Sequence, residues 1–392
     1  MSDDKREDNA CSLSLTERLW SNDPSLDRLD LTELSTVHCS PSLDIFLQAL
    51  QENTTVRTVH VGPLVVEMAS FATLNRLLQA IASTQGVQSI EVAQPHVNAP
   101  VPIGGKSLAA LMAVVSLQSL ILWPFCRLTP DEVRMTADAV RNHTSLHTVA
   151  LLNVCLRQNN NNNNADGNTG STPPQDDHEE IEEVDSTGIA PPPPVSMDPL
   201  LTALATVPQL TTLHLVSGVS VVTPTTTPVV SVTSLVHFLQ HAPRSLHTLV
   251  LRNWGLTDKH GAVFVQALLQ NPTQTDCSLA ASLRSMDVRF NSFTTSTYQS
   301  LVSLLQTNTV LECLETDLTD SGSDDNSNNK LFQDMTWLLS LNRAGRGTFL
   351  LDDTATKQER IACLYKAHDE VSILFYLLTH NPSVCENNSK SL

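Results

Sequence analysis

The sequence predicts an α/β solenoid in which short strands and helices alternate and stack, with a parallel sheet on the concave side and helices on the convex side. A pattern of apolar, two variable residues, apolar, one variable residue, apolar occurs nine times, and its starts are 30, 31, 30, 29, 64, 36, 37 and 28 residues apart. A helix pattern follows most of these strand patterns. A near-fixed period with one strand per unit is typical of stacked repeats.

Composition fits a long array with an acidic surface. Of the 392 residues, 41% are hydrophobic and 4% aromatic, which favours a core of leucine, valine and alanine over an aromatic-lined pocket. A formal charge of −18 repels phosphate, so we expect neither nucleic-acid binding nor binding to anionic membranes. No signal-peptide pattern or membrane-length apolar run is present. We therefore expect a cytoplasmic protein, with the nucleus as the alternative.

Residues 1–22 are polar, and we expect a flexible leader there. The repeat array is expected over residues 23–341. Alternation along each strand directs the fourth and sixth positions into the core and the third, fifth and seventh onto the concave face. The nine strand patterns begin at Leu26, Val56, Val87, Leu117, Leu146, Leu210, Leu246, Leu283 and Leu311.

Helix starts are visible between the strands. Thr129 followed by Pro130 combines a capping residue with a first-turn proline, and Thr257 and Thr294 open two later helices. Leu43, Phe46, Leu47 and Leu50 show the helical spacing i, i+3, i+4, i+7. Gly104-Gly105-Lys106-Ser107 resembles part of a phosphate loop but lacks the upstream glycine, so we read it as a helix start.

One segment interrupts the period. Residues 157–195 contain six asparagines from Asn159 to Asn164, an acidic run from Asp176 to Asp185 and four prolines from Pro191 to Pro194. The segment has few large apolar residues, so burial cannot offset the conformational entropy lost on ordering. We therefore expect a disordered insertion within repeat five.

The C-terminal part reads as helical. Residues 329–341 and 356–380 carry helical patterns, and no further strand pattern follows them. Stacked arrays need a cover over the last repeat. We therefore expect residues 342–392 to form a helical cap and tail.

The strand pattern with a helix every 28 to 31 residues in most units resembles leucine-rich repeats, in particular the ribonuclease-inhibitor-like class. Leu283 to Asn291 is the clearest strand unit and keeps that family's asparagine at the ninth position. Leu246 to Gln270 is the clearest complete unit. The resemblance covers residues 26–341 and implies a horseshoe-shaped array. The C-terminal part also resembles the closure of uncharacterised members of that class.

The residues at equivalent strand positions on the concave face suggest one binding surface. The fifth and seventh strand positions are apolar in the middle of the array and charged toward its C-terminal end. Tryptophan and arginine are enriched at binding hot spots. The candidate protein-binding residues are therefore Trp123, Arg252, Asp287, Arg289 and Glu315. In the alternative interpretation, the two arginines simply pair with acids on neighbouring strands.

Catalytic signatures are missing from the sequence. It has no G-x-S-x-G, H-E-x-x-H or EF-hand pattern, and its eight cysteines form no C-x-x-C pair or zinc spacing. We therefore expect no enzyme, no cofactor and no metal. The favoured hypothesis is a monomeric scaffold that binds an unidentified protein or peptide through its concave face or the rim that carries the insertion. The alternative is a GTPase-activating or other regulatory protein, as in some ribonuclease-inhibitor-like arrays.

Overall fold

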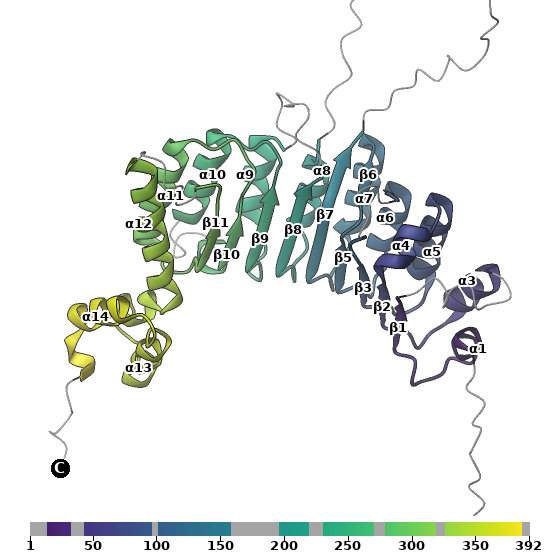
Figure 1. The fold of residues 1–392 in the computed structure, drawn as a ribbon, viewed down its shortest axis with the longest axis horizontal. Coiled ribbons are helices and arrows are strands. Elements are labelled where there is room, and N and C mark those ends of the chain that lie inside the picture. Colours follow the sequence, from purple (N-terminus) through teal and green to yellow (C-terminus); the bar gives the residue numbers. More distant parts are fainter. Residues whose placement is uncertain are drawn as a thin grey trace, which may run out of the picture.

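The chain folds as an α/β solenoid with a parallel sheet along one side and helices along the other (Figure 1). This computed structural model describes residues 14–32, 43–95, 101–157, 196–218, 230–269, 279–318 and 326–385. The expected insertion at 157–195 therefore lies outside the described residues, apart from its first position, Arg157.

Each predicted strand lies in one 11-stranded sheet, in the order β1-β2-β3-β5-β7-β8-β9-β10-β11. Arg28 pairs with Thr58 and Thr58 with Ser89. Equivalent pairs continue to Ser285 and Cys313, so the register follows the repeat. The strands on this path are β1 Arg28–Leu31, β2 Thr58–Val61, β3 Ser89–Val92, β5 Ser119–Leu122, β7 Thr148–Leu156, β8 Thr212–Ser217, β9 Thr248–Arg252, β10 Ser285–Asp287 and β11 Cys313–Glu315.

A second ladder runs beside the main sheet. β4, Ile103–Gly104, pairs with β6, Cys126–Leu128, and β6 pairs with the second half of β7. β7 spans both ladders, and its register with β8 shifts between Leu151 and Val154. In the middle of the array, neighbouring repeats are therefore hydrogen-bonded also after the end of the predicted strand pattern.

The convex helices are placed by capping and by apolar faces. Thr129 and Glu132 form a capping box at the start of one of them, and their buried faces point toward the sheet. The helices of the array are α3 Leu43–Glu52, α4 Pro63–Met68, α5 Phe71–Ser83, α6 Gly105–Met112, α7 Pro130–Arg141, α8 Asp198–Leu204, α9 Val232–His241, α10 Asp258–Leu269 and α11 Thr295–Thr307, with the short 3-10 turn η1 Leu279–Ala281.

The core is a continuous aliphatic layer between sheet and helices. The fourth strand positions are buried from end to end, as the alternation predicts: Leu29, Val59, Ile90, Leu120, Val149, Leu213, Leu249, Met286 and Leu314. Trp254, at an inward position, is 1% exposed and donates its indole N–H to the main-chain oxygen of Leu215 at 2.8 Å.

The first described residues differ from the expected flexible leader. Residues 15–20 form the helix α1, Leu15–Trp20, which opens with a capping box between Ser14 and Glu17. Leu19 is 0% exposed and belongs to the main core, because α1 packs against α3. This segment therefore covers the N-terminal end of the array.

The C-terminal end also differs from the expected cap. The helix that packs on the last repeat is α12, Asn326–Arg343, which contacts α11 and contributes Met335 and Leu339 to the main core. The helices α13, Lys357–Lys366, and α14, Val371–His380, instead form a hairpin with a separate core, set off from the array (Figure 1). The π-helix η2, Gly347–Leu351, and the 3-10 turn η3, Pro382–Cys385, complete it.

Candidate functional site

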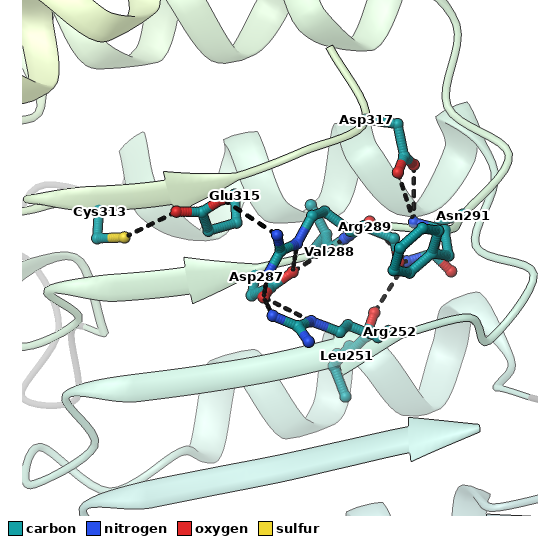
Figure 2. Close-up of polar contacts among 10 residues, drawn as sticks. Leu251, Arg252, Asp287, Val288, Arg289, Asn291, Cys313, Glu315 and Asp317 are labelled. Atoms are coloured by element: carbon teal, nitrogen blue, oxygen red, sulfur yellow. Dashed lines mark hydrogen bonds and ion pairs between the residues drawn. The ribbon is translucent and has the colours of Figure 1, made fainter. Parts of the chain in front are cut away.

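Four of the five predicted binding residues lie together at the C-terminal end of the concave face (Figure 2). Asp287 on β10 is in register with Glu315 on β11, and Arg252 ends the neighbouring strand β9. Arg289 lies two residues beyond the end of β10. The parallel register therefore brings four charged side chains from three adjacent strands into one cluster.

Asp287 is the centre of this cluster. Its side chain is only 6% exposed. It accepts a hydrogen bond from Arg252 Nε at 2.6 Å, and Arg289 donates from Nη2 at 2.9 Å and from its main-chain N–H at 3.2 Å. Figure 2 shows both guanidinium groups turned toward this one carboxylate. Asp287 is therefore a buried acid held by two arginines.

The titration behaviour reflects this arrangement. Burial would raise the pKa of Asp287, but the hydrogen bonds from Arg252 and Arg289 outweigh burial and hold its pKa below the usual range. The same hydrogen bond to Asp287 raises the pKa of Arg289. Arg289 also reaches Glu315, with Nη1 and Oε2 3.5 Å apart. Both arginines do pair with acids across neighbouring strands, as the alternative interpretation expected.

Trp123 does not join the cluster. It follows β5, and the strands β7 and β8 lie between β5 and β9 in the sheet. Three strand spacings amount to about 14 Å. Trp123 is 37% exposed, and its main-chain oxygen accepts a hydrogen bond from Asn153 at 2.6 Å. The single patch expected from the sequence is therefore two separate features of the concave face.

An exposed phenylalanine lies at the rim of the cluster and does not stand out in the sequence. Phe290 is 64% exposed and has a φ of 61°. This left-handed conformation is unfavourable for a bulky residue. The carboxylate of Asp317 accepts the main-chain N–H of Phe290 at 2.7 Å and so holds the turn. The equivalent residue of the preceding repeat is Asn253, a residue type that adopts this conformation readily, with a φ of 60°.

The ninth-position asparagine fixes the loop under this rim. Asn291 donates its amide to the main-chain oxygens of Leu251 at 2.8 Å and Val288 at 2.7 Å (Figure 2). Its side-chain oxygen accepts the main-chain N–H groups of Trp254 and Leu256 at 3.0 and 3.1 Å. One asparagine thus joins two neighbouring repeats at the strand ends. Phe290 therefore projects from a rigid turn.

The glycine pair that resembles a phosphate loop starts α6, as the sequence indicates. A side chain on Gly105 would collide with Glu132, whose Cβ lies 2.4 Å from the position of an added Cβ. The Gly104 N–H already donates to Asn75 Oδ1 at 2.9 Å. An acidic side chain thus lies over the helix start, which disfavours an anion there.

The remaining chemistry of the described residues is sparse. Within these ranges, no group of three or more histidines, cysteines and acids is placed to hold a metal ion. Burial raises the pKa of the Cys126 thiol to about 12 and also raises the pKa of Cys313, which makes both thiols poor nucleophiles at neutral pH. None of the helices in these ranges has the length and apolar character needed to span a bilayer.

No family model and no curated protein matches the chain. Among solved structures, LegL7, a leucine-rich-repeat-containing protein from Legionella pneumophila, is 15% identical over 83% of this chain and 95% of its own, with a TM-score of 0.31. The yeast Rad7–Elc1 complex is 11% identical over 78% of this chain and 73% of the other, with a TM-score of 0.37.

A third structure, the actin-binding site 2 of leiomodin-1, is 16% identical over 36% of this chain and 76% of its own, with a TM-score of 0.26. These TM-scores are too low to support the fold. The evidence for the fold is the repeat register of the sheet itself.

Proposed function

We propose that the chain is a non-enzymatic scaffold that binds a protein or peptide partner at the C-terminal end of its concave face. The supporting observation is the position of Phe290, an exposed aromatic side chain on a strained turn beside the ion-paired cluster of Arg252, Asp287, Arg289 and Glu315. Strained backbone conformations of this kind cluster at functional sites. An apolar anchor ringed by charged groups is typical of a binding hot spot.

The charged cluster gives this anchor a fixed setting. Arg252 and Arg289 are each about one-third exposed, with side-chain exposures of 32% and 33%, while Asp287 orients both guanidinium groups. Their remaining donors can bond to partner carbonyl or carboxylate groups without reorganisation. Trp123 is then a second, separate contact point for an extended partner. In the ribonuclease-inhibitor-like class that the repeats resemble, the sheet forms the concave face, which is the face proposed here for binding.

Affinity capture from cell extract with the full chain tests the proposal. We expect the wild type to enrich specific proteins and Phe290→Asn or Glu315→Lys to lose most of that enrichment. Met135→Glu is the matched control, because Met135 is 45% exposed on the convex helix α7. Equal capture by Phe290→Asn and the wild type would contradict the proposal.

The GTPase-activating alternative stays an untested prediction. Rates of GTP hydrolysis by a small panel of GTPases, measured with and without the chain, would test it. The proposed scaffold function predicts no change in these rates.

A further inference from the structure

The last strand of the sheet has one open side. In the part of the chain that the structure describes, β11 pairs with β10 and with no further strand. Figure 1 shows β11 at the end of the array, beside α12 and apart from the hairpin of α13 and α14. An edge strand of this kind presents main-chain N–H and C=O groups that can pair with another chain.

The repeat shows which groups of β11 are open. In each earlier repeat, the main-chain oxygen at the second strand position accepts two N–H groups from the next strand, as that of Arg284 does from Glu312 and Cys313 at 2.7 and 2.9 Å. Glu312 occupies this position in the last repeat, and its main-chain oxygen accepts no hydrogen bond from the described residues. Cys313 and Glu315 bond to the preceding repeat, so the N–H and C=O of Leu314 between them point to the open side.

The aliphatic core is also less covered at this end. The fourth strand positions of the earlier repeats are at most 1% exposed, whereas Leu314 in β11 is 6% exposed. At the other end α1 covers the first repeat, and Leu29 there is 1% exposed. Stacked arrays need a cover over each terminal repeat. The hairpin does not supply it here, because its buried residues form a separate cluster.

A groove of about 250 Å³ lies between β11 and α12. Leu314 and Leu318 line it on the strand side, and Phe332, Met335 and Leu339 line it on the side of α12. Phe332 is half-buried and the other four are buried. The volume is below the ~300–1,000 Å³ of a typical small-molecule site, so it fits apolar side chains of a chain that continues beyond the groove.

The segment that follows β11 in the sequence is unsuited to fill this groove. Residues 319–325 read Thr-Asp-Ser-Gly-Ser-Asp-Asp and contain no large apolar side chain. Aspartate and glycine are also depleted in strands. This segment therefore offers neither a strand for the edge nor an apolar group for the groove.

We propose that this edge binds an extended peptide segment of a partner protein, which adds to β11 as a parallel strand and places alternate apolar side chains in the groove. The parallel direction repeats the hydrogen bonds of the array. Two consecutive peptide N–H groups donate to the main-chain oxygen of Glu312, and the peptide also pairs with the N–H and C=O of Leu314. In recognition of this kind, main-chain hydrogen bonds give affinity and pockets for alternate side chains give specificity.

The register with β11 defines the chemistry of the peptide. Its residues opposite Leu314 and Thr316 face inward, so they are apolar. The residue between them lies on the concave face beside Glu315, whose side chain is 50% exposed and whose ion pair with Arg289 lies on the side of β10. Opposite charges on neighbouring strands stabilise pairing, so this residue is basic. The expected pattern is apolar, basic, apolar.

This edge site is separate from the surface around Phe290 that is proposed for the scaffold function. The two share Glu315, but the strand edge and the groove belong to β11 and α12. Because β11 has only three residues, we expect an isolated peptide to bind with a dissociation constant on the order of 100 µM. A partner that contacts both sites binds more tightly than the peptide alone.

Fluorescence anisotropy with the full chain and the labelled peptide Leu-Gln-Thr-Leu-Lys-Val tests strand addition. We expect saturable binding that becomes at least tenfold weaker when the amide nitrogen of the threonine is methylated, because this N–H donates to Glu312. Methylation of the next amide, that of the second leucine, is the matched control, because that N–H points away from β11. No binding up to about 500 µM protein overturns the proposal, as does equal binding of the peptide methylated at threonine.

Thr336→Arg tests the location of the site. Thr336 is exposed and lines the groove, so a long side chain there fills the groove, and circular dichroism checks that the fold is retained. We expect at least tenfold weaker peptide binding. Gln333→Arg, at an exposed position of α12 outside the lining, is the matched control. Equal binding by Thr336→Arg and the wild type overturns the location.

Two further measurements separate the alternatives. Sedimentation velocity of the chain alone tests a second copy as the occupant, and a dimer that Thr336→Arg removes would overturn the peptide proposal. Phe290→Asn is expected to bind the peptide as the wild type does, because Phe290 lies outside the groove. Failure of the edge site therefore leaves the scaffold proposal untouched, and the reverse also holds.

Discussion

The buried amide of Asn342, at the end of α12, donates to the main-chain oxygen of Asn308 at 2.9 Å. Asn308, at the end of α11, does the same to the main-chain oxygen of Leu268 at 3.3 Å. Asn53 repeats the contact at the other end of the array, with Leu19 as the acceptor at 2.9 Å. The C-terminal part is thus attached by the device that joins consecutive repeats.

The attachment predicts a stability cost for Asn342→Ala. Asn342 is 3% exposed, and its amide also donates to the main-chain oxygen of Leu311 at 2.8 Å. The substitution leaves two buried acceptors without this donor, so we expect a loss of about 1–3 kcal/mol in the free energy of unfolding. Urea denaturation measures it. Asn329→Ala, which removes an exposed contact to Gln333 on the same helix, is the control and is expected to change stability by less than about 0.5 kcal/mol.

Asp287→Ala is expected to destabilise the array more than the loss of a surface acid does. It leaves Arg252 and Arg289 close together without the acid between them, which we expect to cost about 2–4 kcal/mol. Asp287→Asn keeps an acceptor and should cost less. The control is Asp30→Ala, in the same concave column, where the carboxylate is 45% exposed and 4.0 Å from Arg28. Equal effects at the two positions would contradict a special role for Asp287.

The lowered pKa of Asp287 also predicts sensitivity to acid. The ionised carboxylate stabilises the folded state above the unfolded pKa of about 4, and that contribution is lost as the pH falls through the lower folded pKa. Wild-type stability should therefore decrease below about pH 4 more steeply than that of Asp287→Asn. Thermal unfolding from about pH 7 to about pH 3 measures the difference.

Much of the array follows from the sequence because each strand signal is local. Val59, Leu120 and Met286 were expected at equivalent positions of one sheet, and the register places them there. The features that the sequence does not predict depend on contacts between repeats. The conformation of Phe290 depends on Asp317, which belongs to the next repeat. The position of the hairpin is not predictable for a similar reason, because apolar spacing on α14 does not say which body its residues bury against.

The asparagine contacts show the same limit. Thr84 occupies the place of Asn53 in the next repeat and donates its hydroxyl to the main-chain oxygen of Leu50 at 2.9 Å. His143 occupies it two repeats later and is 5% exposed. Since different residue types occupy one structural position, no column of identical letters reveals it.

His260 predicts a loss of stability at mildly acidic pH. It is 1% exposed, its Nδ1 accepts the main-chain N–H of Thr257 at 3.1 Å, and its Nε2 donates to the main-chain oxygen of Val230 at 3.0 Å. Burial lowers its pKa, despite the opposing effect of the bond to Val230. The ring is neutral when folded, so unfolding takes up a proton and stability falls as the pH drops below about 6.5.

Burial also lowers the pKa of His143 and His214, so the wild type should show their contributions together with that of His260. Chemical denaturation between about pH 7.5 and about pH 5 measures the slope of stability against pH. His260→Gln, which does not titrate, is expected to flatten that slope. His247→Gln is the control, because His247 is exposed. An unchanged slope in His260→Gln would show that His260 takes up no extra proton on unfolding and would contradict the prediction.

Phe290→Asn is expected to separate stability from binding. Asparagine tolerates the φ of 61° better than phenylalanine does, and the main-chain bond to Asp317 does not depend on the side chain. Phe290 is 64% exposed, so little apolar burial is lost. We therefore expect the free energy of unfolding to stay equal or to rise by up to about 1 kcal/mol, while partner capture falls. Urea denaturation and affinity capture on the same preparation measure the two effects. If Phe290 served folding alone, Phe290→Asn would lower stability and leave capture by the folded protein unchanged. That result would show that Phe290 does not belong to the binding surface.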